Sequence, residues 1–176
     1  MGPAPVGDDV GDDTSPPVQE IPAEHRPQAL ACPSNSTGGV ACNDSAECNG
    51  DTPGALPNNC LHGQCGPDQC LDDGDCGSNE VCSCLTQGSG GYPGPQVGAG
   101  NVCVAALCHV DADCGAEGYC SPSSSADCTN LGGVTGYYCH RPGDACVNDS
   151  DCRGLSCVYD TTLGRWACQE AVICAG

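Results

Sequence analysis

The chain of 176 residues contains no phenylalanine and no lysine, and it has a single tryptophan and a single methionine. Valine, isoleucine and leucine together number only 24. Burial of aliphatic and aromatic surface is the main favourable term in folding, so these absences exclude an ordinary hydrophobic core. Low apolar content combined with a net charge of −19 would by itself predict disorder.

Two further absences limit the partners and the compartment. No segment approaches the ~20 apolar residues of a membrane span. Met1 is followed by Gly2, Pro3 and Ala4, without the basic start and apolar run of a signal peptide. We expect a mature chain whose export signal, and any lipid anchor, has been removed. Repulsion from phosphate groups argues against nucleic acid as a partner and against adsorption to an anionic membrane, and the lack of an apolar span argues against direct membrane insertion.

What the chain has in abundance is cysteine, about one residue in nine. An even number of cysteines at this density predicts a disulfide scaffold in an oxidising compartment, outside the cell or at its surface. Each bridge can contribute ~2–4 kcal/mol, mostly by restricting the unfolded chain. The predicted disulfide-forming residues are Cys32, Cys42, Cys48, Cys60, Cys65, Cys70, Cys76, Cys82, Cys84, Cys103, Cys108, Cys114, Cys120, Cys128, Cys139, Cys146, Cys152, Cys157, Cys168 and Cys174.

An acidic heptapeptide bracketed by two cysteines occurs four times, as CNDSAEC, CLDDGDC, CHVDADC and CVNDSDC. These heptapeptides begin at residues 42, 70, 108 and 146, a spacing typical of arrays of small units. Residues 1–31 lack cysteine but carry six prolines and six acidic residues, which predicts an extended tether. The predicted organisation is a tether at 1–31 and four repeats at 32–69, 70–107, 108–145 and 146–176.

The number of cysteines in each repeat constrains their pairing. Repeats 2, 3 and 4 each hold five, so each must send at least one bond outside itself if all are oxidised. Five cysteines would give two and a half bonds per repeat, so the same complete set of internal bonds cannot occur in each repeat. We favour bridges between neighbouring repeats, which would stiffen the array, and the sequence leaves the pairing itself open.

The expected fold is a set of small disulfide-rich repeats with short β-hairpins and loops, little helix, and an elongated shape. The strand candidates are Asn101–Ala106, Gly136–His140, Ser156–Tyr159 and Arg165–Gln169. The last two flank Asp160–Gly164, a glycine-containing turn, and predict a hairpin. Ser89–Gly100 is predicted to be an inserted surface loop.

The acidic heptapeptide has two interpretations. Closely spaced carboxylates could bind calcium, which needs about six to eight oxygen ligands, although no EF-hand loop is present. The alternative is a turn, in which Asp and Asn side chains accept hydrogen bonds from backbone N–H groups. We favour the turn and keep calcium as a possible cofactor. The calcium candidates are Asp72, Asp73, Asp75, Asp111, Asp113, Asp149 and Asp151.

Other chemistry has little support. The histidines and cysteines lack the spacing of a zinc site, and a reactive thiolate needs cationic neighbours that are scarce here. No other cofactor and no catalytic residue is predicted, so we expect a protein that is not an enzyme. Tyr92, Tyr119 and Tyr137 are the binding candidates, because tyrosine buries much area at interfaces and keeps a polar group.

The segments CVNDSDCRGLSC and CHVDADCGAEGYC resemble cysteine-rich tandem repeats of secreted and surface proteins, above all the myxobacterial type of cysteine-rich lipoprotein and adhesion receptor. Their cysteine spacing is also similar to the Dickkopf cysteine-rich domain. CVNDSDCRGLSC further resembles the whey-acidic-protein inhibitor core, although this chain lacks the adjacent cysteine pair of that family. The resemblance covers residues 32–176 and implies a place and an architecture more than a ligand.

These observations lead to one main hypothesis and two alternatives. The main hypothesis is a non-enzymatic module at the cell surface or outside the cell, a rod of repeats for adhesion, recognition or assembly, whose partner is another surface protein or a second copy. The first alternative is a secreted protease inhibitor that presents Ser89–Gly100 as a rigid loop. The second is a calcium-dependent structural protein.

Overall fold

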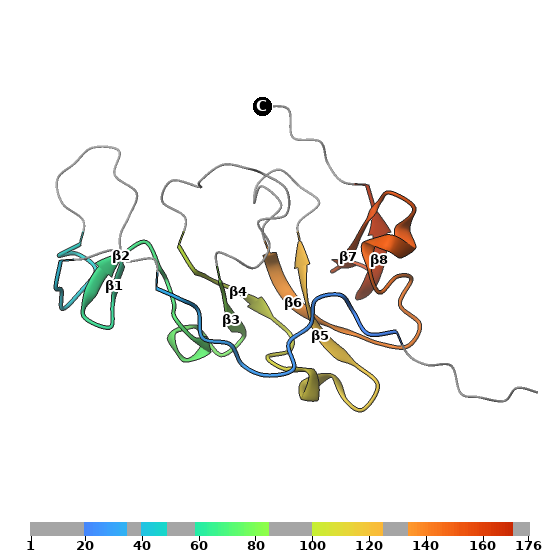
Figure 1. The fold of residues 1–176 in the computed structure, drawn as a ribbon, viewed down its shortest axis with the longest axis horizontal. Coiled ribbons are helices and arrows are strands. Elements are labelled where there is room, and N and C mark those ends of the chain that lie inside the picture. The colour runs from blue at the N-terminus through green and yellow to red at the C-terminus, as the bar shows by residue number, and fades with distance from the viewer. Residues whose placement is uncertain (1–19, 35–39, 49–58, 85–99, 125–133, 171–176) are drawn as a thin grey trace, which may run out of the picture.

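The computed structural model describes residues 20–34, 40–48, 59–84, 100–124 and 134–170 (Figure 1). Within these residues the chain forms short β-strands and single 3-10 turns, and no α-helix. This confirms the predicted fold class. The strands are β1 Asn59–Leu61, β2 Gln64–Gly66, β3 Glu80–Ser83, β4 Val102–Ala106, β5 Tyr119–Ser124, β6 Val134–His140, β7 Ser156–Asp160 and β8 Arg165–Gln169, and the 3-10 turns are η1 Asp73–Asp75, η2 Asp111–Cys114 and η3 Asp149–Cys152.

Each predicted repeat contains one antiparallel hairpin: β1–β2, β3–β4, β5–β6 and β7–β8. The four predicted strands are confirmed as β4, β6, β7 and β8, with small shifts at their ends. The predicted turn between β7 and β8 is also confirmed, because the Gly164 N–H donates to the Asp160 carbonyl at 2.7 Å. The sequence analysis missed the other four strands.

The disulfides follow one pattern in all four repeats. In each hairpin a cysteine on the first strand lies directly opposite a cysteine on the second strand, as Cys60 lies opposite Cys65. The first cysteine of the heptapeptide bonds to the first strand and the second cysteine bonds to the second strand. These bonds are Cys42–Cys60, Cys48–Cys65, Cys70–Cys82, Cys76–Cys103, Cys108–Cys120, Cys114–Cys139, Cys146–Cys157 and Cys152–Cys168.

A ninth bond, Cys32–Cys84, lies outside this pattern. Cys84 is the one cysteine of repeat 2 outside the hairpin pattern, and it bonds to a residue ahead of the first heptapeptide, as the odd cysteine count of repeat 2 required. The remaining cysteines of repeats 3 and 4, Cys128 and Cys174, lie outside the described residues. All cysteines among the described residues are disulfide-bonded.

Repeats 2 and 3 share one sheet. Its strand order is β3-β4-β6-β5, and β4 runs parallel to β6 where Ala105 and Ala106 pair with Gly136 and Tyr137. The main apolar cluster packs on this sheet and includes Val81, Val104, Ala106 and Tyr137. The hairpins of repeats 1 and 4 form separate two-stranded sheets at the two ends of the row (Figure 1).

Residues 20–32, here called the strap, correct the prediction of a solvated tether over 1–31. The strap runs along the row of repeats in the direction opposite to the chain that follows (Figure 1). The Arg26 N–H donates to the Cys120 carbonyl at 2.8 Å, and the Cys32 N–H donates to the Leu71 carbonyl at 2.7 Å. The composition of this segment predicted a solvated chain, because composition does not show that Arg26 and Cys32 have partners far along the sequence, at Asp73 and Cys84. Residues 1–19 lie outside the described residues, and the predicted repeat boundaries stay predictions.

Candidate functional site

The sixth residue of each heptapeptide closes the loop on its own backbone. Asp75 accepts hydrogen bonds from the N–H groups of Leu71 at 2.8 Å and Asp72 at 3.3 Å. Asp113 and Asp151 accept the equivalent pairs of bonds in repeats 3 and 4. Hydrogen bonds from backbone donors stabilise the charged carboxylate, so the pKa of each of these three side chains lies below its usual value.

The fourth residue joins the loop to the hairpin. Asp73 accepts the Cys82 N–H at 3.0 Å, Asp111 accepts the Cys120 N–H at 2.9 Å, and Asp149 accepts the Cys157 N–H at 2.7 Å. In each case the donor is the cysteine on the first strand. One carboxylate therefore holds in place the same strand that the first disulfide of the repeat attaches.

Repeat 1 makes the same contacts with different side chains. Glu47 replaces the sixth aspartate and accepts the Asn43 N–H at 2.8 Å. Ser45 replaces the fourth aspartate, and its hydroxyl accepts the Cys60 N–H at 3.1 Å. The repeated heptapeptide is thus a turn unit, which confirms the interpretation that we favoured.

The predicted calcium candidates are all used in this way. Each of the seven aspartates accepts at least one hydrogen bond from a backbone N–H group, and Asp72 accepts that of Gly74 at 2.7 Å. A calcium ion would have to compete with these donors or use the remaining carboxylate oxygens. Calcium binding stays a prediction.

Arg26 of the strap is the most buried charged residue in the part of the chain that the structure describes, at 1% exposed. Its guanidinium donates two hydrogen bonds to the Asp73 carboxylate, at 2.9 and 3.1 Å, and one to the His109 carbonyl at 2.9 Å. It also lies over the Tyr137 ring, 5.1 Å from the centroid. This one side chain connects the strap with repeats 2 and 3. The sequence contains a signal for it, because Arg26 is the only lysine or arginine before Arg141.

The strap contacts the loops of repeats 3 and 4 as well. His25 Nδ1 lies 2.7 Å from Asp111 Oδ2, and the His25 ring meets Tyr119 edge to face. The Ala23 N–H donates to the Asn148 side chain. The heptapeptide loops of three successive repeats therefore hold one extended segment.

The predicted binding tyrosines have different surroundings. Tyr137 is 2% exposed and packs in the main cluster beneath Arg26, which corrects its prediction as a surface residue. Burial raises the pKa of its phenol. Tyr119 is half-buried beside His25. Tyr92 and most of the predicted inhibitor loop, 89–99, lie outside the described residues.

Aromatic rings also pack between repeats 3 and 4. Tyr138 stacks on Tyr159 with centroids 4.0 Å apart, and His140 stacks on Trp166 at 3.9 Å. His140 Nδ1 is buried 3.4 Å from Asp144 Oδ2, within ion-pair range but without a well-formed hydrogen bond. Loss of water around the ring lowers the pKa of His140, and the Asp144 carboxylate opposes that shift in part.

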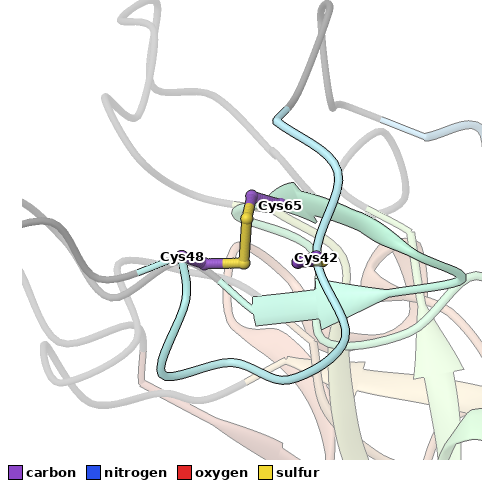
Figure 2. Close-up of side chains that lie close together, drawn as sticks. All are labelled: Cys42, Cys48 and Cys65. Carbon is purple, nitrogen blue, oxygen red and sulfur yellow. A yellow bond between two sulfur atoms is a disulfide. The ribbon is translucent and has the colours of Figure 1, made fainter.

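Three cysteine sulfurs gather within 4.8 Å at each heptapeptide, as Cys42, Cys48 and Cys65 do in repeat 1. Figure 2 shows Cys48 bonded to Cys65 with Cys42 beside them. Metal binding requires thiolates, and these sulfurs are in disulfides. The clusters are therefore covalent staples in the oxidised protein.

A small hollow of about 120 Å³ lies where repeat 1 meets repeat 2. Its wall includes Leu61 and Gln64 from the first hairpin, Asp68 from the end of repeat 1, and Leu71 from the start of repeat 2. The Asp68 carboxylate is 3% exposed and accepts the Asn101 N–H at 2.8 Å. The sequence analysis did not single out this site.

The fold and its bonds define a class of protein, a small disulfide-rich protein built from tandem stapled hairpins. The nine disulfides between described residues indicate an oxidising compartment. No helix among the described residues is long and apolar enough to cross a membrane. The chain matches none of the family models, curated proteins or solved structures with which it was compared.

Proposed function

We propose that the protein is a non-enzymatic interaction module of the cell surface or the extracellular space, which acts in adhesion, recognition or assembly. The observation that carries this proposal is the repeated stapled hairpin: four similar units stand in a row, and the strap connects three of them (Figure 1). A row of rigid units offers a large contact surface at a low cost in conformational entropy on binding.

The use of the polar side chains supports a binding role over catalysis. The acidic residues of the heptapeptides accept backbone N–H groups, and Arg26 and His25 bind aspartates of these loops. These contacts maintain the shape of the loops. A surface that keeps its shape without a partner fits a recognition module.

Beads coated with the oxidised full-length chain test this proposal. We expect coated beads to aggregate with one another, or to bind cells of the source organism, in a saturable manner. Beads coated with the reduced and alkylated chain are the matched control, because they keep the sequence but lose the staples. Equal behaviour of the two preparations, or no binding by either, would contradict the proposal.

A further inference from the structure

The hollow between repeats 1 and 2 combines a buried carboxylate with two leucine side chains in an otherwise polar wall. Asp68 lines it at 3% exposed, held by the Asn101 N–H at 2.8 Å and by the Ser34 hydroxyl at 3.4 Å. Leu61 and Leu71 line it from the two repeats. A long cationic side chain has matching parts, because its alkyl stem packs on apolar surface while its charged end pairs with a carboxylate.

The charge around the hollow also favours a cation. Residues 32–106 contain eight acidic residues and neither lysine nor arginine. Clefts lined by one sign of charge concentrate the field and attract ions of the opposite sign. Asp75 is a second carboxylate nearby, and its Oδ1 lies 3.1 Å from Nε2 of His62, a residue that lines the hollow.

The size of the hollow restricts the ligand. Pockets that enclose whole small molecules measure about 300–1,000 Å³. At about 120 Å³ this hollow is too small for a nucleotide or a sugar but has room for the end of a single side chain.

The same molecule shows how this fold holds a guanidinium group. Arg26 pairs with Asp73, donates to a backbone carbonyl and lies over an aromatic ring, all between two repeats. The hollow repeats part of this arrangement at the junction of repeats 1 and 2, because its wall contains a buried carboxylate and two leucine side chains.

We infer that this hollow receives an arginine or lysine side chain of the partner protein, bound as an alkyl guanidinium or alkyl ammonium group. The inference rests on the proposed function, because it names the contact by which the module recognises a partner. It predicts that partners present an exposed basic residue to the junction of repeats 1 and 2.

The test is a titration of the ¹⁵N-labelled oxidised chain with n-butylguanidinium, followed by amide chemical shifts. We expect saturable shifts at Leu61–Gly66, Asp68 and Leu71, and none with n-butylurea, which is neutral and similar in shape. A blocked Gly-Arg-Gly peptide should give the same shifts. Binding of the small ion without binding of the peptide would overturn the assignment to a protein side chain.

Variants make the test specific. Gln64→Lys places an ammonium group at an exposed position on the wall, and we expect it to weaken binding of the probe at least tenfold by occupying the hollow. Thr161→Lys makes the same charge change on repeat 4 and should leave binding unchanged. Asp68→Asn should also abolish the shifts, and Gln64→Lys keeps the test valid if that variant does not fold.

Failure would take either of two forms: no saturable shifts with n-butylguanidinium, or equal shifts in the wild type and in Gln64→Lys. Both overturn the basic side-chain site. Because this titration uses no partner, its failure is distinguishable from failure of the bead experiment, which tests the proposed function itself.

Discussion

Repeat 1 and the pair formed by repeats 2 and 3 use the same staples in different surroundings. The shared sheet of repeats 2 and 3 carries an apolar cluster that includes Val81, Val104 and Tyr137. Repeat 1 has two strands of three residues, and among its described residues from Val40 to Gly66 only Cys42 and Gly66 are buried. The same disulfides therefore complement a core in one region and substitute for a core in the other.

The largest expected effect is a loss of stability in repeats 2 and 3. Arg26→Met leaves the Asp73 carboxylate without the guanidinium, and breaking a buried ion pair costs about 3–5 kcal/mol. Denaturant unfolding measures this loss. Hydrogen exchange should rise in repeats 2 and 3 and remain unchanged in repeat 1, and the double variant Arg26→Met/Asp73→Asn should recover part of the stability. Equal exchange in all repeats would contradict this division.

The next largest expected effect is a loss of stability confined to repeat 1. Replacing Cys48 and Cys65 by serine removes a bond that closes a loop of 17 residues, worth about 3 kcal/mol on the loop-entropy estimate. Without an apolar cluster, repeat 1 should open locally and its β1–β2 amides should lose protection from exchange. Replacing Cys114 and Cys139 is the matched control, and there we expect β5–β6 to retain partial protection. The comparison fails if both variants lose protection equally.

A smaller effect should appear on acidification at the junction of repeats 3 and 4. The folded-state pKa of His140 is lowered by desolvation, so the unfolded chain binds the proton more readily and stability falls as the pH drops from about 6.5 towards the folded-state pKa. Trp166 is the only tryptophan and stacks on this ring, so its fluorescence follows the titration directly. His140→Gln should remove the transition. A transition that persists in this variant would assign it to another group.

The heptapeptide carboxylates should change the stability of the protein at a lower pH than His140 does. The pKa of Asp113 lies below its usual value because it accepts the His109 and Val110 N–H groups, so its contribution is present above about pH 4 and is lost as the pH falls through the lowered pKa. Asp113→Asn should therefore flatten the acid limb of the stability curve. Glu117→Gln, at an exposed residue of the same repeat, serves as the control and should change the curve less.

The smallest expected effect is that of calcium. Because the candidate aspartates already accept backbone N–H groups, replacing a chelator with calcium should shift the melting temperature very little, in repeat 1 and in repeats 2 and 3 alike. Thermal melting with calcium, with magnesium and with chelator measures this. A large shift specific to calcium would support the calcium-dependent alternative.

Strands with clear β-forming residues could be predicted, and others could not. Val102–Ala106 contains two valines, and Arg165–Gln169 contains a tryptophan and follows a predicted turn. These local patterns were sufficient to predict both strands. Asn59–Leu61, Gln64–Gly66 and Tyr119–Ser124 are short or contain glycine or proline. They are strands because disulfides and partner strands hold them, which no local pattern reports.

A disulfide scaffold of repeats with acidic turns can be predicted from the amino-acid sequence, because cysteine density, period and aspartate placement are local properties of the chain. The folded chain was needed to show that the two cysteines of each heptapeptide bond to facing strands, that Cys32 bonds to Cys84, and that the strap binds the repeats. These outcomes depend on contacts between residues far apart in the chain, as between Ala23 and Asn148, which are 125 positions apart. Many pairings satisfy the same composition, and three-dimensional packing selects one of them.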